Sequence, residues 1–155
     1  MKTRNSFDPE KLSLLRVDVV SGAIDNPLEI KYEDVKQTKV ELGFSAGFNL
    51  EQKKAKVELE IRVSTTFEKE PQAHGRFRIA YLFGVDNLEE LVEIKKDKSI
   101  QVSENLGLAL ANISYSTARG ILFSRFQATA FRNFILPIIS PKAILESGME
   151  ESAPE

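Results

Sequence analysis

Three successive stretches of strict apolar–polar alternation constrain this chain more than any other feature of its sequence. They occupy residues 40–49, 57–67 and 76–83. Because the side chains of a strand point alternately to opposite faces, each stretch predicts a strand with one apolar and one polar face. The segments between them, 51–55 and 68–72, are short and polar. The three strands are therefore predicted to pair as antiparallel hairpins.

A fourth alternation precedes these three. Leu15, Val17 and Val19 are apolar and are separated by polar residues, until Gly22 interrupts the pattern. We expect a first strand there. Residues 25–37 contain a proline and no clean period, which is typical of a long connection. The four strands are expected to form a four-stranded antiparallel sheet in the order of a meander.

Beyond the last strand the apolar period becomes helical. Asn87 and Glu90 have the spacing of a helix cap and predict a short helix. Ser103 is the expected cap of a long helix that runs to about Thr129. Ser140-Pro141 predicts the start of a short C-terminal helix. Strands first and helices afterwards indicate an α+β fold, in which helices cover one face of the sheet.

Small side chains recur along the long helix at intervals of four residues. They are Ser116, Gly120, Ser124 and Ala128. Such a row lets another backbone approach closely, so we expect a helix–helix contact between subunits. The alternative is close packing of the helix onto its own sheet.

No pattern typical of an active site or a metal site is found. The chain has no cysteine, which excludes thiolate chemistry and favours a reducing compartment, the cytoplasm. His74 is the only histidine and has no acidic or hydroxyl neighbour in sequence, so we expect an exposed strand residue. Gly43 and Gly47 lack the ending of a phosphate-binding loop. We therefore expect no enzyme activity, no metal and no other cofactor.

Charge and hydropathy restrict the partners. The net charge is −2, and no stretch approaches the roughly 20 apolar residues of a membrane helix, so neither nucleic acid binding nor membrane insertion is expected. The basic residues are dispersed except for two short clusters that are predicted to be solvated turns: Lys53, Lys54 and Lys56, and Lys95, Lys96 and Lys98.

Two motifs follow within and after the long helix. Residues 112–122 read Asn-Ile-Ser-Tyr-Ser-Thr-Ala-Arg-Gly-Ile-Leu, and residues 129–141 read Thr-Ala-Phe-Arg-Asn-Phe-Ile-Leu-Pro-Ile-Ile-Ser-Pro. They resemble the C-terminal half of the SecB family of export chaperones. The positions that carry the resemblance are Tyr115, Ala118, Arg119, Phe131 and Pro137.

The resemblance extends over residues 12–146 in the order and spacing of the elements. It leaves residues 1–11 as an expected flexible N-terminus and residues 147–155 as an expected disordered acidic tail. It implies a homotetramer, a dimer of dimers with eight-stranded sheets outside and long helices between them. It further implies a cytoplasmic chaperone that binds unfolded polypeptides in apolar grooves without ATP and passes them to the motor SecA for export.

The resemblance also implies site residues. The groove would be lined from the connection after the first strand, a neighbouring strand and the last helix, with core packing as the alternative for each residue: Ile24, Leu28, Ile30, Tyr32, Phe44, Ile138, Ile144 and Leu145. The contact between dimers would be made on the fourth predicted strand by Phe77, Ile79 and Tyr81, together with the small-residue row of the long helix.

Two departures from the export chaperones bear on the client. Of the positions that correspond to the acidic SecA-docking residues, Ser21, Asp25 and Arg78, only Asp25 is acidic. The segment 93–102 is longer than in the export form. The sequence looks closer to SecB-like chaperones that accompany toxin–antitoxin systems or are otherwise solitary, whose client would be an antitoxin or a few partners. A static interaction scaffold on the same fold, binding one folded partner by shape, is the further alternative.

Overall fold

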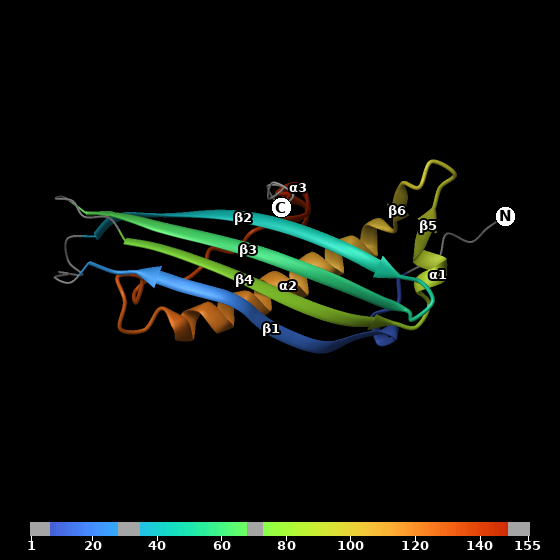
Figure 1. Cartoon of the computed structure of the whole chain (residues 1–155), viewed down its shortest axis with the longest axis horizontal. Coiled ribbons are helices and arrows are strands. Elements are labelled where there is room, and N and C mark those ends of the chain that lie inside the picture. The colour runs from blue at the N-terminus through green and yellow to red at the C-terminus, as the bar shows by residue number, and fades with distance from the viewer. Residues whose placement is uncertain (1–6, 28–34, 68–72, 149–155) are drawn as a thin grey trace.

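One twisted antiparallel sheet packs against one long helix (Figure 1). The computed structural model describes residues 7–27, 35–67 and 73–148. The main elements are β1 (Leu12–Asp25), β2 (Val35–Asn49), β3 (Lys54–Phe67), β4 (Ala73–Val85) and α2 (Glu104–Arg125). The smaller ones are η1 (Pro9–Lys11), α1 (Leu88–Leu91), β5 (Val92–Ile94), β6 (Ile100–Val102) and α3 (Pro141–Glu146).

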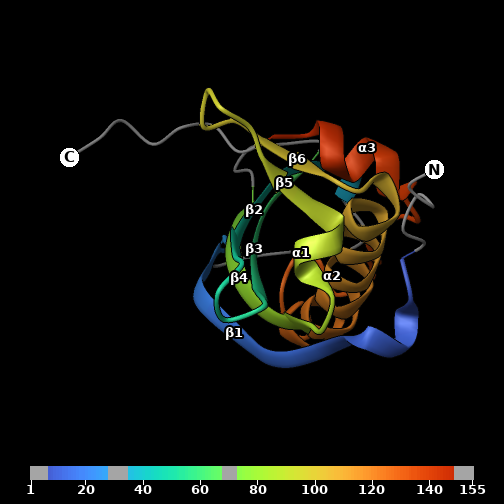
Figure 2. The ribbon, with the colours of Figure 1, turned by 90° about the vertical axis from the view of Figure 1, so that its right-hand side faces the viewer.

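The predicted alternation decides which face of the sheet is buried. The apolar series of β3, from Ala55 to Val63, is buried, whereas the intervening positions point to the opposite face. β4 alternates in the same way, with Phe77, Ile79, Tyr81 and Phe83 buried. Figure 2 shows the sheet curving around α2, which covers its inner face. The α+β class and the four-stranded antiparallel sheet are thereby confirmed.

The strand order corrects the prediction of a meander. β2, β3 and β4 are consecutive hairpin neighbours as expected, but β1 pairs with β4, and the order is β1-β4-β3-β2. This is a Greek key arrangement in which the long connection comes first. Short turns dictate hairpins, whereas the long segment between Asp25 and Val35 lets the chain cross from one edge of the sheet to the other.

β1 is longer than predicted, because Gly22 does not end it. A Cβ at Gly22 would lie 2.8 Å from Cδ1 of Phe77, so the missing side chain makes room for this ring. The irregularities of β1 fall elsewhere, at register shifts between Leu14 and Arg16 and between Val19 and Ser21. A glycine inside a strand often marks the close approach of a neighbour and is not by itself an end signal.

The long helix is shorter than predicted. α2 ends at Arg125, and Ala128 adopts φ 61°, a left-handed conformation outside any helix. The chain turns here because Phe131 and Phe134 pack around Phe126, at ring centroid distances of 5.4 and 6.3 Å. Ala128 therefore does not belong to the small-residue row. Among the described residues no helix is both long and apolar enough to cross a membrane.

The starts of both short helices are confirmed. Asn87 precedes α1 but makes no side-chain capping bond to the backbone, and its amide donates instead to the Glu90 carboxylate over 3.1 Å. At α3 the backbone N–H of Ala143 donates to the Ser140 hydroxyl over 3.3 Å. Two elements were not predicted. Residues 92–102 form the β5–β6 hairpin, and η1 lies inside the N-terminal stretch expected to be flexible.

Candidate binding groove

An open apolar groove of about 310 Å³ lies between the edge strand β2 and the N-terminal part of α2. β6 and α3 complete its walls. The lining residues are Phe44, Ala46 and Phe48 from β2, Ile100 and Val102 from β6, Ser103, Glu104, Gly107 and Leu110 from α2 or its cap, and Leu145 from α3. Most of the lining is apolar, so the groove can bury apolar side chains from another molecule.

The strand wall follows directly from the alternation. Phe44, Ala46 and Phe48 occupy successive inward positions of β2, opposite Leu59, Val57 and Ala55 of β3 in register. Phe44 is buried, Phe48 is half-buried and Ala46 is exposed. The inner face of β2 is thus incompletely covered within this chain, since α2 lies over the middle of the sheet.

The helix wall depends on a missing side chain. A Cβ at Gly107 would lie 3.4 Å from Cδ1 of Leu145. The glycine therefore lets α3 pack closely against α2 and brings Leu145 to the rim of the groove.

Two of the motif residues position α3. The Tyr115 hydroxyl donates to the carbonyl oxygen of Pro137, and Nε of Arg119 donates to that of Leu136 over 3.0 Å. These bonds hold the segment that leads from α2 to α3 against the helix. Burial raises the pKa of the Tyr115 hydroxyl, although the charge of Arg119 partly opposes this. The motif therefore has a structural role.

Only some of the residues predicted to line a client-binding groove lie in this groove. Phe44 and Leu145 line it, whereas Ile144 is buried in the core. Ile24 is half-buried opposite Gly75, and Ile138 is 86% exposed, and neither lines the groove. Leu28, Ile30 and Tyr32 lie outside the described residues.

Several lining residues were not predicted. Ala46 and Phe48 could have been found, since they share the alternating face of Phe44. Ile100 and Val102 could not, because the β5–β6 hairpin has no repeating pattern long enough to reveal it.

The predicted subunit contact on β4 requires a correction. Phe77, Ile79 and Tyr81 are at most 2% exposed and pack inside this chain. The ring of Phe77 meets that of Phe126 at 6.0 Å, and the Tyr81 hydroxyl donates to the Ser114 carbonyl over 2.7 Å. They are core residues and offer no surface to another subunit. Alternation identifies an apolar face but not which element covers it.

Three residues of the small-residue row do lie at the surface. Ser116, Gly120 and Ser124 are exposed on α2, and a Cβ at Gly120 would have nothing within 4 Å. Phe123, on the same helix, is 49% exposed. This side of α2 is therefore not packed against its own sheet.

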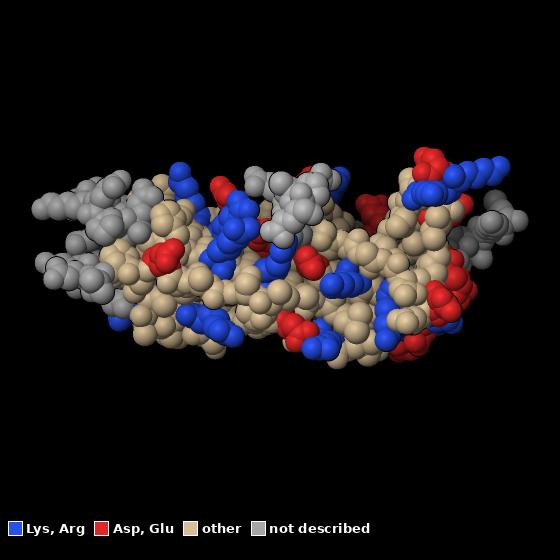
Figure 3. Space-filling model, viewed as in Figure 1, with Lys and Arg blue, Asp and Glu red and all other residues tan. Residues whose placement is uncertain are grey.

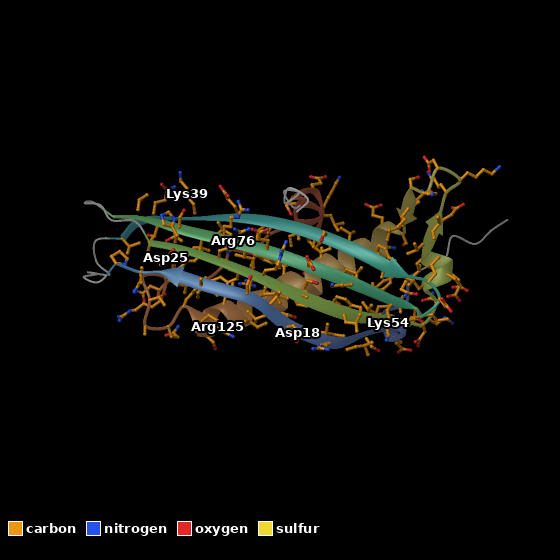
Figure 4. All side chains as sticks on the ribbon, in the orientation of Figure 1. Asp18, Asp25, Lys39, Lys54, Arg76 and Arg125 are labelled. Carbon is orange, nitrogen blue, oxygen red and sulfur yellow. The ribbon has the colours of Figure 1, made fainter. Side chains whose placement is uncertain are left out.

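The outer face of the sheet carries charges of both signs (Figure 3). A polar recess there is lined by Ala23, Asp25, Lys39, Glu41, Arg62, Val63, Ser64, His74, Gly75 and Arg76. Figure 4 places Asp25, Lys39 and Arg76 toward the same end of the sheet. His74 is exposed on β4, as expected. Within the described residues, no three His, Asp or Glu side chains are grouped as metal ligands.

Glu60 is the buried member of this charged face. Its Oε1 lies 2.9 Å from Nε of Arg62 and 2.9 Å from an Nη of Arg76. Burial alone would raise the pKa of Glu60, but hydrogen bonds and charges from Arg62 and Arg76 together hold it below its ordinary value. The carboxylate thus joins β3 to β4 across two arginines that stand opposite each other in register.

Comparison with known proteins relates this geometry to one fold. No protein-family model and no curated protein sequence matches the chain. Among solved structures, the SecB-like chaperone of Mycobacterium tuberculosis, in complex with a ChAD peptide from the HigA1 antitoxin, superposes with a TM-score of 0.55 at 12% identity. The match covers 84% of this chain and 92% of that one. The fold is that of SecB-like chaperones. The fold implied by the sequence resemblance is thereby confirmed.

Proposed function

We propose that this protein is a chaperone that binds unfolded or unassembled polypeptide segments in the β2–α2 groove without ATP. The observation that carries the proposal is the apolar groove at the uncovered part of β2, on a fold whose solved neighbour holds an antitoxin peptide. Burying one large apolar side chain contributes about 1.5–3 kcal/mol. A single groove contact therefore holds a client weakly.

Useful affinity requires several grooves acting on one client. In a homotetramer, binding at one groove raises the effective concentration of the rest of the client at the others. The exposed small-residue row of α2, Ser116, Gly120 and Ser124, is suited to close helix packing between subunits. β1 is an edge strand and is suited to pairing two sheets into one of eight strands. Both contacts are part of the proposal.

Two observations favour a narrow clientele over an export function. The solved neighbour binds an antitoxin peptide. In addition, Asp25 shares the outer face of the sheet with Arg76 and Arg78, so this face is mixed in charge where SecA docking would call for acidic residues. We therefore propose an antitoxin, or a few similar partners, as the client of a cytoplasmic chaperone. Asp25 remains the proposed contact if SecA does bind.

The test compares two neighbouring residues on opposite faces of β2. Ala46→Glu places a charge in the groove. Gly47→Glu is the matched control, since its side chain would enter open space on the outer face, opposite Lys56. Light scattering measures the mass of each protein alone and with reduced, carboxymethylated α-lactalbumin, a permanently unfolded probe. Native α-lactalbumin serves as the folded comparison.

We expect the wild type and Gly47→Glu to bind the unfolded probe and not the folded one, and Ala46→Glu to bind at least about tenfold more weakly, since burying an unpaired charge costs several kcal/mol. Equal binding by both variants would place the client elsewhere. A protein that ignores every unfolded chain but captures one folded partner would be a scaffold.

A further inference from the structure

We propose that the β5–β6 hairpin selects client segments in which apolar residues are flanked by acidic ones. This inference rests on the proposed chaperone function and specifies the client of the same groove. The hairpin projects beyond the sheet next to the N-terminal end of α2 (Figures 1 and 2).

The apolar face of the hairpin continues the groove. Val92 pairs with Val102, and Ile94 pairs with Ile100, so the four side chains share one face of the two strands. Val92 is buried and Val102 is half-buried, whereas Ile94 and Ile100 are 58% and 50% exposed. Because Ile100 and Val102 also line the groove, the exposed isoleucine pair extends its apolar wall outward.

The turn of the hairpin is a defined structure. The Lys95 N–H donates to the Ser99 carbonyl over 2.8 Å, and the Lys98 N–H donates to the Lys95 carbonyl over 2.9 Å. Asp97 accepts hydrogen bonds from the backbone N–H and the hydroxyl of Ser99, at 3.0 and 2.6 Å. The turn therefore presents its lysines at fixed positions along the chain.

Within the described residues, these lysines have no counter-charge at ion-pair distance. Lys95, Lys96 and Lys98 form no ion pair with the described part of the chain, whereas Lys53 and Lys56 do. Glu93 lies opposite Gln101, on the face of the hairpin away from the isoleucines. In Figure 3 blue atoms project from this tip beside red ones. The hairpin itself therefore carries three lysines against the two carboxylates Glu93 and Asp97, whereas the carboxylate of Glu104 belongs to the groove lining next to it.

The spacing sets the client pattern. Lys95 directly follows Ile94, and Lys98 lies in the turn two residues before Ile100, with φ 67°, so both lysines are close in sequence to the exposed isoleucine pair. An extended client with apolar side chains against Ile94 and Ile100 would place its next two or three residues beside the lysines. Acidic residues there would form exposed ion pairs, each of which strengthens binding by a factor of about 1.4 to 5.

A peptide fits this site better than a membrane or a nucleic acid. Anionic lipid surfaces are typically recognised by clusters of about 4–8 basic residues, and phosphate backbones by concentrated basic faces. The hairpin offers three lysines against Glu93 and Asp97, next to an apolar wall. Charge and apolar surface together match an apolar segment with an acidic flank.

Three fluorescent peptides test the proposal with the full-length protein. They share the core Phe-Leu-Val-Phe and end in Glu-Glu-Glu, Gln-Gln-Gln or Lys-Lys-Lys. Fluorescence anisotropy measures their dissociation constants for the wild type, for Lys95→Gln/Lys96→Gln/Lys98→Gln, and for the matched control Lys11→Gln/Lys54→Gln/Lys56→Gln. Circular dichroism checks that each variant is folded.

We expect the wild type and the control to bind the Glu peptide about tenfold more tightly than the Gln peptide at low salt. The preference should shrink at about 0.5 M NaCl and disappear in the hairpin variant, with the Gln peptide unaffected. Equal binding of the Glu and Gln peptides by the wild type would overturn the acidic preference and leave the groove function standing.

Failure of all three peptides to bind, in a protein that still binds the unfolded α-lactalbumin probe, would overturn this inference alone. Failure of that probe as well would overturn the proposed function, and this inference with it. Phosphatidylserine vesicles and duplex DNA are measured in parallel. Three results together would show that the peptide proposal is wrong: the wild type binds the vesicles or the DNA, the hairpin variant loses that binding, and the three peptides bind equally. The hairpin would then bind a lipid or a nucleic acid.

Discussion

The hydroxyl of Tyr81, on β4, donates a hydrogen bond to the backbone carbonyl oxygen of Ser114, on α2, over 2.7 Å. Both residues are buried, at 1% and 0% exposure. The bond crosses the interface between the sheet and the helix that covers it. It therefore links the register of the helix to the strand that pairs with both β1 and β3.

Tyr81→Phe should lower the free energy of unfolding by about 1 kcal/mol at pH 7, because it removes this hydrogen bond and keeps the ring. Burial raises the pKa of Tyr81 above its unfolded value of about 10. The stability that this shift contributes is complete below about pH 10 and is lost as pH rises toward the folded-state pKa. Urea unfolding followed by circular dichroism should show the loss in the wild type and less of it in Tyr81→Phe. Equal pH dependence in both proteins would contradict this assignment.

Glu60→Gln should destabilise the protein in a pH-dependent way. The pKa of Glu60 is held below its ordinary value by Arg62 and Arg76, against the opposing effect of burial. Its contribution to stability is present above about pH 4.3, the unfolded value, and is lost as pH falls through the folded-state pKa. We expect a cost of about 1 kcal/mol at pH 7, since both arginines are partly exposed, and almost none near pH 3. A cost independent of pH, measured by the same unfolding experiment, would indicate lost packing and not lost charge.

Substitutions at Gly120 distinguish the stability of the single chain from the association of subunits. Because a Cβ there meets nothing within 4 Å, Gly120→Ala should stabilise α2 by about 0.5–1 kcal/mol in the isolated chain. If helices pack together at this row, Gly120→Leu should lower the mass measured by light scattering. Asn105→Leu, an exposed substitution near the start of α2, is the control. An unchanged mass for Gly120→Leu would remove α2 from the proposed interface.

Arg119→Ala should loosen the connection between α2 and α3. It removes the hydrogen bond to the Leu136 carbonyl and leaves that group without its side-chain donor, which costs about 1–2 kcal/mol. Hydrogen exchange measured by mass spectrometry should show faster exchange in residues 134–146. Arg125→Ala, at the exposed end of the same helix, should leave this segment unchanged. Unaltered exchange in Arg119→Ala would mean that apolar packing alone holds α3.

The starts of the elements were largely readable from local patterns. Alternation predicted the strands and the buried faces of β3 and β4, and the caps at Asn87 and Ser140 predicted where α1 and α3 begin. The misjudged boundaries depend on distant residues. Gly22 stays within β1 because Phe77 lies over it, and α2 stops at Arg125 because Phe131 and Phe134 return to Phe126. Neither contact leaves a signal in the residues nearby.

The groove residues were likewise predicted only in part. The resemblance to the SecB family implied Phe44 and Leu145 as groove residues, and both line the β2–α2 groove. Ile144, its neighbour on the same short helix, lies in the core. A six-residue helix shows too little periodicity to tell its buried side from its open one.

The sequence by itself determined which residues alternate, where the chain turns tightly, and where helices begin, because these depend on steric and hydrogen-bonding preferences of residues a few positions apart. Only the tertiary structure decided that β1 lies beside β4, that Phe77, Ile79 and Tyr81 are covered by the chain's own helix, and that the inner face of β2 stays partly open. These three outcomes depend on which of several apolar surfaces meet once the chain is compact. The hydrophobic free energy gained depends on the apolar area that is buried and not on how far apart the residues lie along the chain.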